Sequence, residues 1–402
     1  MLSRTGMSAS SSSQAESAAL CPHFGSCGGC QLQDRDYDAQ VKLKEERVSS
    51  ILEAAGAPRP SVHPSPQAWY YRNKMEFSFG DVYPPLPGGP TVKLGLKPKG
   101  RWYEILDLAD CRLLSPETPG LLAAVRSWAQ GNALPPFNSH RHSGLLRHLV
   151  VREAKNAPER MVILVTSPGA IPKESFLEAV LSAYPATTLL WGKNGKISDT
   201  AVSDSLEVLS GPGFITESLR LPGVELKFRI SPHSFFQTNT RGAEVLYGLL
   251  RSWLKEAAAS KVLDLYCGGG GIALSVAGVC REVAGVELNA SAIEDARANA
   301  ALNLIENVKF YSGAVETLLP SLLDMSPDVA VADPPRAGLH SKVLEALREL
   351  GPANLFYVSC NPESLERDLA VLKDRYGVRR SAVVDLFPHT EHVETLVWLT
   401  RL

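Results

Sequence analysis

From residue 230 to the C-terminus, short apolar runs alternate with longer segments whose apolar residues recur at helical spacing. Short apolar runs are typical of strands buried on both faces of a parallel sheet. The longer segments are typical of helices that cover such a sheet. The pattern therefore predicts an α/β, Rossmann-like domain over residues 230–402. We expect strands at 262–265, 283–287, 308–311, 329–332, 355–359, 379–386 and 394–399, and helices at 241–258, 291–302, 340–350 and 363–375.

Between residues 60 and 229 the pattern changes to short, partly alternating runs that glycine and proline interrupt. Such runs predict a largely antiparallel sheet, and two amphipathic segments within them predict helices. We therefore expect a central α+β domain over 60–229. Its predicted strands are 72–79, 91–96, 102–106, 145–153, 160–166 and 188–191, its predicted helices are 118–130 and 173–184, and a Pro/Gly turn is predicted at 81–90.

The N-terminal region divides into a tail and a small unit. Residues 1–20 are rich in Ser and Ala and lack the apolar segment of a secretory signal, so we expect a disordered tail. Residues 34–56 carry an apolar stripe at helical spacing and end at Gly56 and Pro58, which predicts one helix. We expect residues 21–59 to form a cysteine-containing loop followed by this helix.

Composition is that of an ordinary globular protein, with 45% hydrophobic and 21% charged residues and a formal net charge of −2. No apolar run is long enough to span a bilayer, so no membrane partner is expected, and we expect a cytoplasmic monomer. Residues 61–160 contain 13 Lys and Arg against 8 Asp and Glu, a mild basic excess compatible with RNA contacts. Seven cysteines in a protein without a secretory signal favour metal binding or catalysis over disulfides.

A glycine-rich turn follows the strand predicted at 262–265, in the order Asp264-Leu-Tyr-Cys-Gly-Gly-Gly-Gly271. Glycines at such a turn let a ligand approach the backbone, and the following helix start offers free N–H groups. Glu287, at the end of the next strand, can bind both hydroxyls of a ribose. The spacing differs from the dinucleotide motif Gly-x-Gly-x-x-Gly. It resembles the first motif of S-adenosylmethionine-dependent methyltransferases, which makes that cofactor the expected ligand.

Three cysteines lie close together in Cys21-x5-Cys27-x2-Cys30. Cys111 is the one further cysteine before the expected methyltransferase domain, so it is the candidate for a fourth ligand. Three clustered cysteines and a distant one suit a [4Fe–4S] cluster. Zinc held by the same four thiolates and unliganded reduced thiols are the alternatives.

Two further motifs follow neighbouring predicted strands. Asp333-Pro-Pro-Arg336 comes directly after the strand at 329–332, and the arginine stands where amino-methyltransferases carry an aromatic residue. Cys360, in Val-Ser-Cys-Asn-Pro, ends the next strand and so lies on the same rim of the sheet. A thiolate that adds to C6 of a pyrimidine makes C5 nucleophilic. We therefore expect Cys360 in a partly exposed, electropositive site, with a buried structural cysteine as the alternative.

The segment Pro388-His-Thr-Glu391-His-Val-Glu394 lies between the last two predicted strands. After methylation at C5 a proton must leave that carbon before the thiol can be expelled, and a carboxylate can accept it. Glu391 and Glu394 both offer one, and their spacing does not choose between them. A solvated polar loop is the alternative interpretation.

Together these motifs resemble the RNA (uracil-5-)-methyltransferase family from Cys21 to the C-terminus. The resemblance implies that Cys360 is the nucleophile and Glu394 the base, and it favours the [4Fe–4S] cluster at Cys21, Cys27, Cys30 and Cys111. It also implies contacts to S-adenosylmethionine by a dispersed set of residues: Gln237, Tyr266, Gly271, Glu287 and Asp333. The cysteine motif is nearest to members that act on 23S ribosomal RNA, so we expect that RNA in preference to transfer RNA.

Two departures from the family pattern stand out. The chain has the Ser-rich tail where many ribosomal members begin with a small β-barrel domain, and Ser312-Gly-Ala314 lacks a polar side chain that some relatives direct at the adenine. Two other functions remain as alternatives. One is a non-catalytic RNA-binding iron–sulfur protein, which the presence of both Cys360 and Glu394 disfavours. The other is DNA cytosine methylation, which the lack of a Pro-Cys nucleophile motif disfavours.

Overall fold

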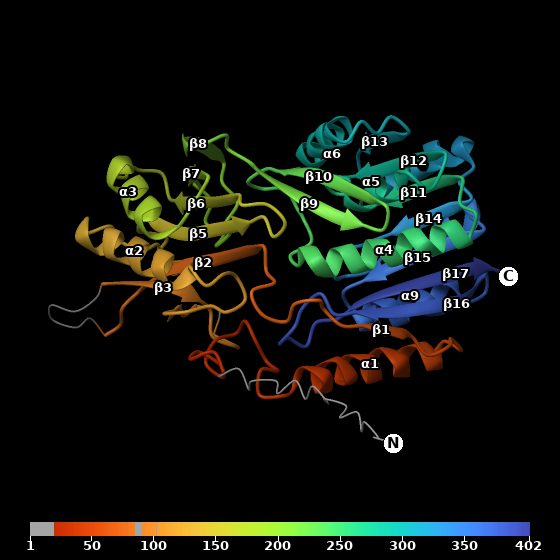
Figure 1. Cartoon of the computed structure of the whole chain (residues 1–402), viewed down its shortest axis with the longest axis horizontal. Helices are drawn as coiled ribbons and strands as arrows, with labels where there is room; N and C mark the ends of the chain where they lie inside the picture. Colours follow the sequence, from red (N-terminus) through yellow and green to blue (C-terminus); the bar gives the residue numbers. More distant parts are fainter. Residues whose placement is uncertain (1–19, 85–90, 102) are drawn as a thin grey trace, which may run out of the picture.

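The computed structural model describes residues 20–84, 91–101 and 103–402. Two helix-covered β-sheets lie side by side, and the N-terminal segment runs along the lower edge of both in the view of Figure 1. The smaller sheet belongs to the central part of the chain and the larger one mainly to its C-terminal part. The disordered tail predicted for residues 1–20 lies outside the described residues except for its last position.

The large sheet has eight strands in the described part of the chain, in the order β1-β16-β17-β15-β14-β11-β12-β13. β17 runs antiparallel to both of its neighbours, and the other neighbouring pairs are parallel. Seven of the strands correspond to those predicted after residue 230, so the Rossmann-like α/β fold is confirmed. They are β11 (Lys261–Leu265), β12 (Glu282–Glu287), β13 (Val308–Ser312), β14 (Val329–Ala332), β15 (Asn354–Ser359), β16 (Tyr376–Val384) and β17 (Glu394–Arg401).

The eighth strand, β1 (Ser61–His63), was not predicted. It adds to the sheet edge by pairing in parallel with Ala382–Val384 of β16, more than 300 positions later in the sequence. Because three residues carry no periodic signal, only the tertiary pairing identifies this strand. Residues 61–63 were expected in the central domain, whereas their strand hydrogen bonds are made with the large sheet.

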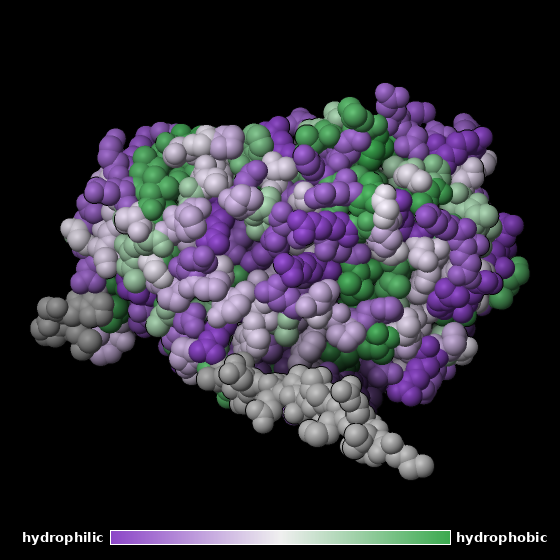
Figure 2. Space-filling model, viewed as in Figure 1, coloured by the Kyte–Doolittle hydropathy of each residue, from purple (hydrophilic) through white to green (hydrophobic). Residues whose placement is uncertain are grey.

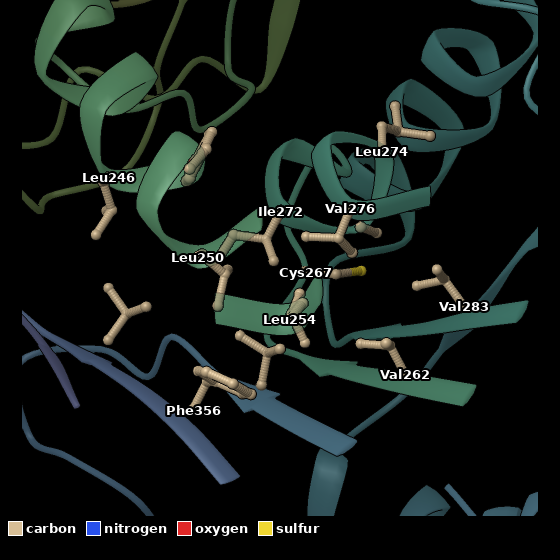
Figure 3. Packing of buried hydrophobic residues seen from close by; sticks show 14 of the residues in the cluster. Leu246, Leu250, Leu254, Val262, Cys267, Ile272, Leu274, Val276, Val283 and Phe356 are labelled. Carbon is tan, nitrogen blue, oxygen red and sulfur yellow. The ribbon is translucent and has the colours of Figure 1, made fainter. Parts of the chain in front are cut away.

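Helices cover both faces of the large sheet. α4 (Thr240–Glu256), α5 (Gly271–Ala277) and α6 (Ala290–Leu302) share one apolar core with alternate strand residues, and Figure 3 shows part of it. The opposite face packs against α1 (Tyr37–Ala54), α7 (Val315–Leu318), the 3₁₀ helix at Leu319–Met325, α8 (Ser341–Leu350) and α9 (Pro362–Leu372). Neighbouring residues such as Val262 and Leu263 belong to different cores because successive strand side chains point to opposite faces.

The central sheet has seven described strands in the order β4-β3-β2-β5-β6-β7-β8, and one neighbouring pair, β6 with β7, is parallel. Its predicted antiparallel character is therefore largely present. One face is covered by α2 (Thr118–Gly131) and α3 (Lys173–Ala183). The strands are β2 (Lys74–Asp81), β3 (Val92–Leu96), β4 (Leu106–Asp107), β5 (Leu146–Glu153), β6 (Arg160–Thr166), β7 (Thr188–Lys193) and β8 (Ser205–Ser210).

A hairpin of β9 (Ile215–Leu221) and β10 (Val224–Ile230) joins the two sheets. Ile215 and Ile230 pack with the second face of the central sheet. Leu219 and Phe228 pack in the core that contains α4 and α6. The hairpin therefore packs against both sheets, and the predicted domain boundary at 229/230 falls at the end of β10. This boundary stays a prediction.

The exposed surface is mixed. Figure 2 shows hydrophilic residues over most of the visible face, with separate apolar patches among them. In the described ranges, no helix combines the length and the apolar character needed to cross a bilayer. All seven cysteines are free thiols.

Candidate active site and cysteine pocket

The site lies where β11, β14 and β15 end and β17 begins. Ser359, the last residue of β15, pairs with Thr395, so Cys360 and Glu394 lie beside each other at this rim. Asp333 follows Ala332, the last residue of β14, which pairs with Leu265 of β11. The fold therefore places together three motifs that lie far apart in the sequence, and Asp333 and Cys360 share one rim of the sheet as expected.

The glycine-rich turn lines a pocket at this rim with Gln237, Tyr266, Gly271 and Asp333. Tyr266 has a φ of 65°, a left-handed conformation that a bulky residue adopts only where the surroundings impose it. A Cβ on Gly271 would stand 3.0 Å from the hydroxyl oxygen of Tyr247, so this glycine lets the helix start approach α4 closely. The pocket thus combines backbone N–H groups with aromatic and acidic side chains.

The backbone of Gln237 is held in place by a hydrogen bond from the central domain. Its carbonyl accepts a hydrogen bond from Asn73 Nδ2 at 2.7 Å. Its side-chain Nε2 lies 3.4 Å from Asp333 Oδ2. Two residues further on, Asn239 caps α4 through Gly242 N at 2.9 Å and also donates to the carbonyl of Leu386. This segment therefore links the central sheet to the loop before β17.

Three acidic side chains lie near one another at the rim: Asp264, Asp333 and Glu394. Among the described residues, no Lys, Arg or His forms an ion pair with any of the three. Burial raises the pKa of Asp333 to about 7, and the hydrogen bond from Gln237 opposes this. Burial, and then the charge of Asp333, raise the pKa of Glu394 well above its usual range. The same two causes raise the pKa of Asp264, and a backbone hydrogen bond from Ala273 opposes them. A cation bound here would relieve the repulsion among these carboxylates.

Glu287 ends β12 as predicted and is partly exposed. Its Oε2 accepts a hydrogen bond from Gly268 N at 3.2 Å, and its Oε1 accepts one from Asn289 N at 2.8 Å. The carboxylate therefore lies directly beside the glycine-rich turn. The predicted ribose contact is compatible with this position and stays a prediction.

Cys360 is partly exposed, as expected, but its surroundings are not electropositive. Burial raises the pKa of its thiol to about 11, with further increases from Glu394 and Asp333 that Arg336 only partly offsets. This part of the prediction was wrong, because the strand order places two carboxyl groups next to the thiol. An additional positive charge is needed to favour the thiolate.

The two candidate bases occupy different environments. Glu394 is 2% exposed at the start of β17, beside Cys360 and Asp333. Glu391 is exposed to solvent, and its backbone carbonyl accepts a hydrogen bond from Arg47. The position of Glu394 therefore favours it as the base over Glu391.

The loops that carry Asp333 and Cys360 are joined to each other. Asn361 Nδ2 donates to the carbonyl of Arg336 at 2.9 Å, while its Oδ1 caps α9. Arg336 Nη2 lies 3.4 Å from His392 Nδ1, which brings the loop before β17 to the same place. The three loops thus form one connected rim.

A second pocket is lined by Cys21, Cys27, Cys30 and Cys111. Burial raises the pKa of Cys30 to about 11 and that of Cys111 to about 12, and each thiol is also affected by the others. The described residues contain no group of three or more His, Cys, Asp or Glu side chains arranged to hold a metal ion. The four thiols are nevertheless brought to one hollow from two distant parts of the sequence.

The loop around this pocket is fitted closely to the central sheet. Gly28 N donates to the carbonyl of Lys97 at 3.2 Å, and a Cβ on Gly28 would stand 2.8 Å from that oxygen. His23 Nε2 accepts a hydrogen bond from Ala109 N at 2.9 Å. The segment that contains Cys111 is therefore held against the N-terminal cysteine loop.

Several basic residues of the central domain are engaged within the protein. Arg147 is buried and donates to three backbone carbonyls, and Arg152 is buried beside Ser234. Lys97 and Arg101 form ion pairs with Asp199 and Glu104. Because these four basic residues are engaged within the protein, the surface formed by residues 61–160 is less positive than the count of Lys and Arg indicates.

The fold and the pocket define an S-adenosylmethionine-dependent methyltransferase. The family model described as tRNA (uracil-5-)-methyltransferase matches residues 200–327 and 321–402. An uncharacterized RNA methyltransferase of Caldanaerobacter subterraneus subsp. tengcongensis is 37% identical over 389 residues, covering 95% of this chain and 84% of the relative. One of Porphyromonas gingivalis is 36% identical over 405 residues, covering 95% and 86%. The chain therefore belongs to the RNA (uracil-5-)-methyltransferase family.

A solved structure supports the same conclusion. The tRNA (uracil-54, C5)-methyltransferase of Pyrococcus abyssi, in complex with S-adenosyl-L-homocysteine, has a TM-score of 0.76 and 29% identity to this chain. The similarity covers 94% of this chain and 86% of the archaeal one. The expected family, fold and cofactor class are thus confirmed at this level.

Two residues at or beside the pocket were not singled out from the sequence. Tyr247 of α4 is buried, and its pKa is raised well above the usual range by burial and by the charges of Asp333, Asp264 and Glu394. A tyrosine within an amphipathic helix gives no signal of such a position. Asp264 lies within the glycine-rich motif, and an acid in the middle of an apolar strand was a signal that could have been used.

Proposed function

We propose that this enzyme methylates C5 of a uridine in structured RNA through a covalent adduct between Cys360 and C6 of the base. The observation that carries the proposal is the meeting of the Cys360 thiol with the buried Glu394 carboxyl group at one rim of the sheet. C5 of uracil is a poor nucleophile until a thiolate has added at C6. A rim with a thiol and a carboxyl group side by side supplies both groups that this chemistry needs.

S-adenosylmethionine would be held by Gln237, Tyr266, Gly271, Glu287 and Asp333, and it supplies the methyl group when bound. Four of these residues line the same pocket, and Glu287 contacts the turn that borders it. The uncompensated acids of the pocket support the assignment, because the cofactor carries positive charge. Positive charge beside Glu394 and Asp333 also lowers the pKa of Cys360, and so favours its thiolate.

The proposed reaction makes and breaks bonds at C5 and C6 of the uracil ring. The Cys360 sulfur forms a bond to C6, and the electron pair of the C5–C6 double bond becomes available at C5. When C5 has received the methyl group, its proton passes to a carboxylate oxygen of Glu394. The C5–C6 double bond then re-forms, and the sulfur leaves as the thiolate. In its ionised form, a carboxyl group with a raised pKa is a stronger base than an ordinary one, and this is the form of Glu394 that the step requires.

Glu394→Gln and Cys360→Ala test the mechanism. Glu394→Gln should still form the adduct and methylate C5, but it should release the RNA slowly and leave a protein–RNA band stable to denaturing electrophoresis. Cys360→Ala should bind RNA and form no adduct. Glu391→Gln is the matched control and should turn over normally. If the control traps the adduct while Glu394→Gln does not, the base is Glu391. If neither traps it, no carboxylate of this loop is the base.

We further propose a [4Fe–4S] cluster at Cys21, Cys27, Cys30 and Cys111. The presence of all four thiols in the lining of one pocket supports it, and bound metal would deprotonate thiols whose pKa values burial raises. Zinc held by the same four thiolates is the rival. Iron and sulfide analysis of protein purified without oxygen decides between them. Cys27→Ser should lose iron, while stoichiometric zinc without sulfide would contradict the cluster.

We propose 23S ribosomal RNA as the substrate, on the resemblance of the cysteine motif to ribosomal members of the family. Transfer RNA is the second candidate, because the archaeal enzyme of similar structure acts on uracil 54 of tRNA. In either RNA the uridine must leave the base stack to expose C6 to the thiol. Methyl transfer to purified 23S rRNA and to tRNA, assayed side by side, distinguishes the two. The free thiols of all seven cysteines support a reducing compartment, and we propose that the enzyme acts there as a cytoplasmic monomer.

A further inference from the structure

We infer that a set of N-terminal residues imposes the conformation of the loop that carries the base, and so positions Glu394 for removal of the C5 proton. This inference rests on the proposed function. The loop comprises residues 385–393, between β16 and Glu394, and we call it the base loop. The N-terminal residues that hold it form a set that we call the cradle: Gln31, Leu32, Gln40, Lys44, Arg47, Trp69 and Tyr71.

The base loop is held by its carbonyl oxygens, and most of the donors belong to the cradle. The carbonyl of His389 accepts hydrogen bonds from two backbone N–H groups, those of Gln31 at 2.9 Å and Leu32 at 3.0 Å. The other contacts are Lys44 Nζ to the carbonyl of Phe387 at 2.9 Å, Tyr71 Oη to that of Pro388 at 3.1 Å, and Arg47 Nη1 to that of Glu391 at 3.4 Å. Outside the cradle, Asn239 donates to the carbonyl of Leu386 at 3.1 Å.

His389 is a buried residue of the base loop with an unusual backbone conformation. Its φ of 66° is a left-handed conformation that a non-glycine residue adopts at a cost. Its backbone N–H donates to Gln40 Oε1 at 2.8 Å, and its ring Nδ1 lies 3.2 Å from Gln40 Nε2. One face of the imidazole ring stacks on Trp69, with 3.8 Å between the ring centroids. One glutamine and one indole thus hold the strained residue.

The start of the base loop is fixed by buried charge. Lys44 Nζ donates to Asp385 Oδ1 at 2.7 Å, and both side chains are almost fully buried. Tyr37 Oη donates to Asp385 Oδ2 at 3.0 Å, and Phe387 N donates to Asp385 Oδ1 at 3.0 Å. α1, far from Glu394 in sequence, therefore fixes the point at which the chain leaves β16.

By contrast, the base loop has few contacts of its own. Its recorded internal hydrogen bonds beyond the Asp385 turn include two from Thr390 to the carbonyl of Phe387 and one from His392 N to Thr390 Oγ1. A segment with this few local bonds takes its conformation from its surroundings. Gln31 and Leu32 directly follow Cys30, and both donate to the carbonyl of His389. A well-ordered cysteine loop therefore helps to hold the base loop in place.

The test compares variants that loosen the cradle with one that disturbs α1 elsewhere. Gln40→Met keeps the size of the side chain but removes both contacts with His389. Trp69→Ala removes the stacked ring, and Trp69→Phe restores an aromatic surface. Leu52→Ala is the control, because Leu52 is buried in the core on the same helix. Each variant is assayed for S-adenosylmethionine affinity, adduct formation, adduct release and hydrogen exchange of residues 385–393.

In Gln40→Met and Trp69→Ala we expect release of the adduct to slow by about 10- to 100-fold, the size expected of a small misplacement of a catalytic group. The adduct should accumulate, kcat should fall, KM for S-adenosylmethionine should stay within about twofold, and exchange in the base loop should accelerate. Trp69→Phe should recover most of the rate. Leu52→Ala should lose thermal stability without accumulating adduct. A merely structural role for the cradle would lower all activities together and leave the adduct fraction unchanged.

Two outcomes overturn the inference while leaving the proposed function intact. In one, Glu394→Gln traps the adduct but Gln40→Met and Trp69→Ala release it at the wild-type rate. In the other, Leu52→Ala accumulates as much adduct as they do, so that loss of stability alone explains the effect. If wild-type enzyme forms no 5-methyluridine and no variant forms an adduct, the proposed function itself fails.

Discussion

Loss of the buried ion pair between α1 and the base loop should be among the most destabilising single changes in the N-terminal segment. Lys44 and Asp385 have side-chain exposures of 2% and 0%, and their charged atoms are 2.7 Å apart. Lys44→Met removes the positive charge, keeps a similar volume and leaves the Asp385 carboxylate buried. Removing one partner of a buried pair costs about 3–5 kcal/mol, because the remaining charge is uncompensated.

The structure favours the lower end of that range. Asp385 keeps hydrogen bonds from Tyr37 Oη and Phe387 N, which stabilise its charged form after the lysine is gone. We therefore expect Lys44→Met to lower the free energy of unfolding by about 3 kcal/mol. The double variant Lys44→Met/Asp385→Asn removes both charges and should recover more than half of that loss.

Lys42→Met is the matched control. Lys42 lies on the same helix, its side chain is 72% exposed, and its ion pair with Glu46 spans 3.9 Å. Exposed pairs of this kind contribute little, so the change should be within about 0.5 kcal/mol. Denaturant unfolding followed by fluorescence and by hydrogen exchange in residues 385–393 measures all three variants. A loss below about 1 kcal/mol for Lys44→Met, or a double variant less stable than the single one, would refute the reasoning.

Three further predictions concern the two pockets. The pKa of Asp333 is about 7, and a bound cation favours the charged form of this carboxyl group. The Kd for S-adenosylmethionine should therefore fall about tenfold from pH 6 to pH 8, and calorimetry should detect release of a proton on binding. A Kd that does not change with pH would contradict the assignment of Asp333 to the cofactor site. Because the pKa of the Cys360 thiol is about 11, the rate of its alkylation by iodoacetamide should be low at neutral pH and should increase up to about pH 11. Rapid alkylation of Cys360 at pH 7 would contradict this prediction. Gly28→Ala would place a Cβ 2.8 Å from the carbonyl oxygen of Lys97, so it should weaken docking of the cysteine loop and lower the iron content. Gly131→Ala, with no atom within 4 Å of the added Cβ and no positive φ, should leave the iron content unchanged.

The sequence predicted the large sheet well because its central strands are buried on both faces. Val329–Ala332 is an apolar run bounded by polar residues, and the strand has the predicted limits. The alternation in Val224–Ile230 was an available signal that was not used, and this strand and its partner form the connecting hairpin. β1 has no such signal, since its existence depends on pairing with β16.

The candidate site was predicted in part. Motifs and the family resemblance pointed to Cys360, Glu394 and five residues expected to bind the cofactor, and these roles stay predictions. Spacing alone could not separate Glu394 from Glu391. The difference in burial between these two residues comes from the path of the base loop, which contacts with distant residues such as Gln40 determine. The charges around Cys360 could not be predicted either, because they depend on which side chains the strand order brings together.

The central claim is that this enzyme makes 5-methyluridine by way of Cys360. Its most direct test is methyl mapping of 23S rRNA and tRNA from a strain that lacks the gene, complemented with wild-type protein or with Cys360→Ala. The account predicts that one 5-methyluridine disappears in the deletion strain, returns with the wild-type protein and stays absent with Cys360→Ala. Persistence of every 5-methyluridine in the deletion strain, or restoration by Cys360→Ala, would contradict it.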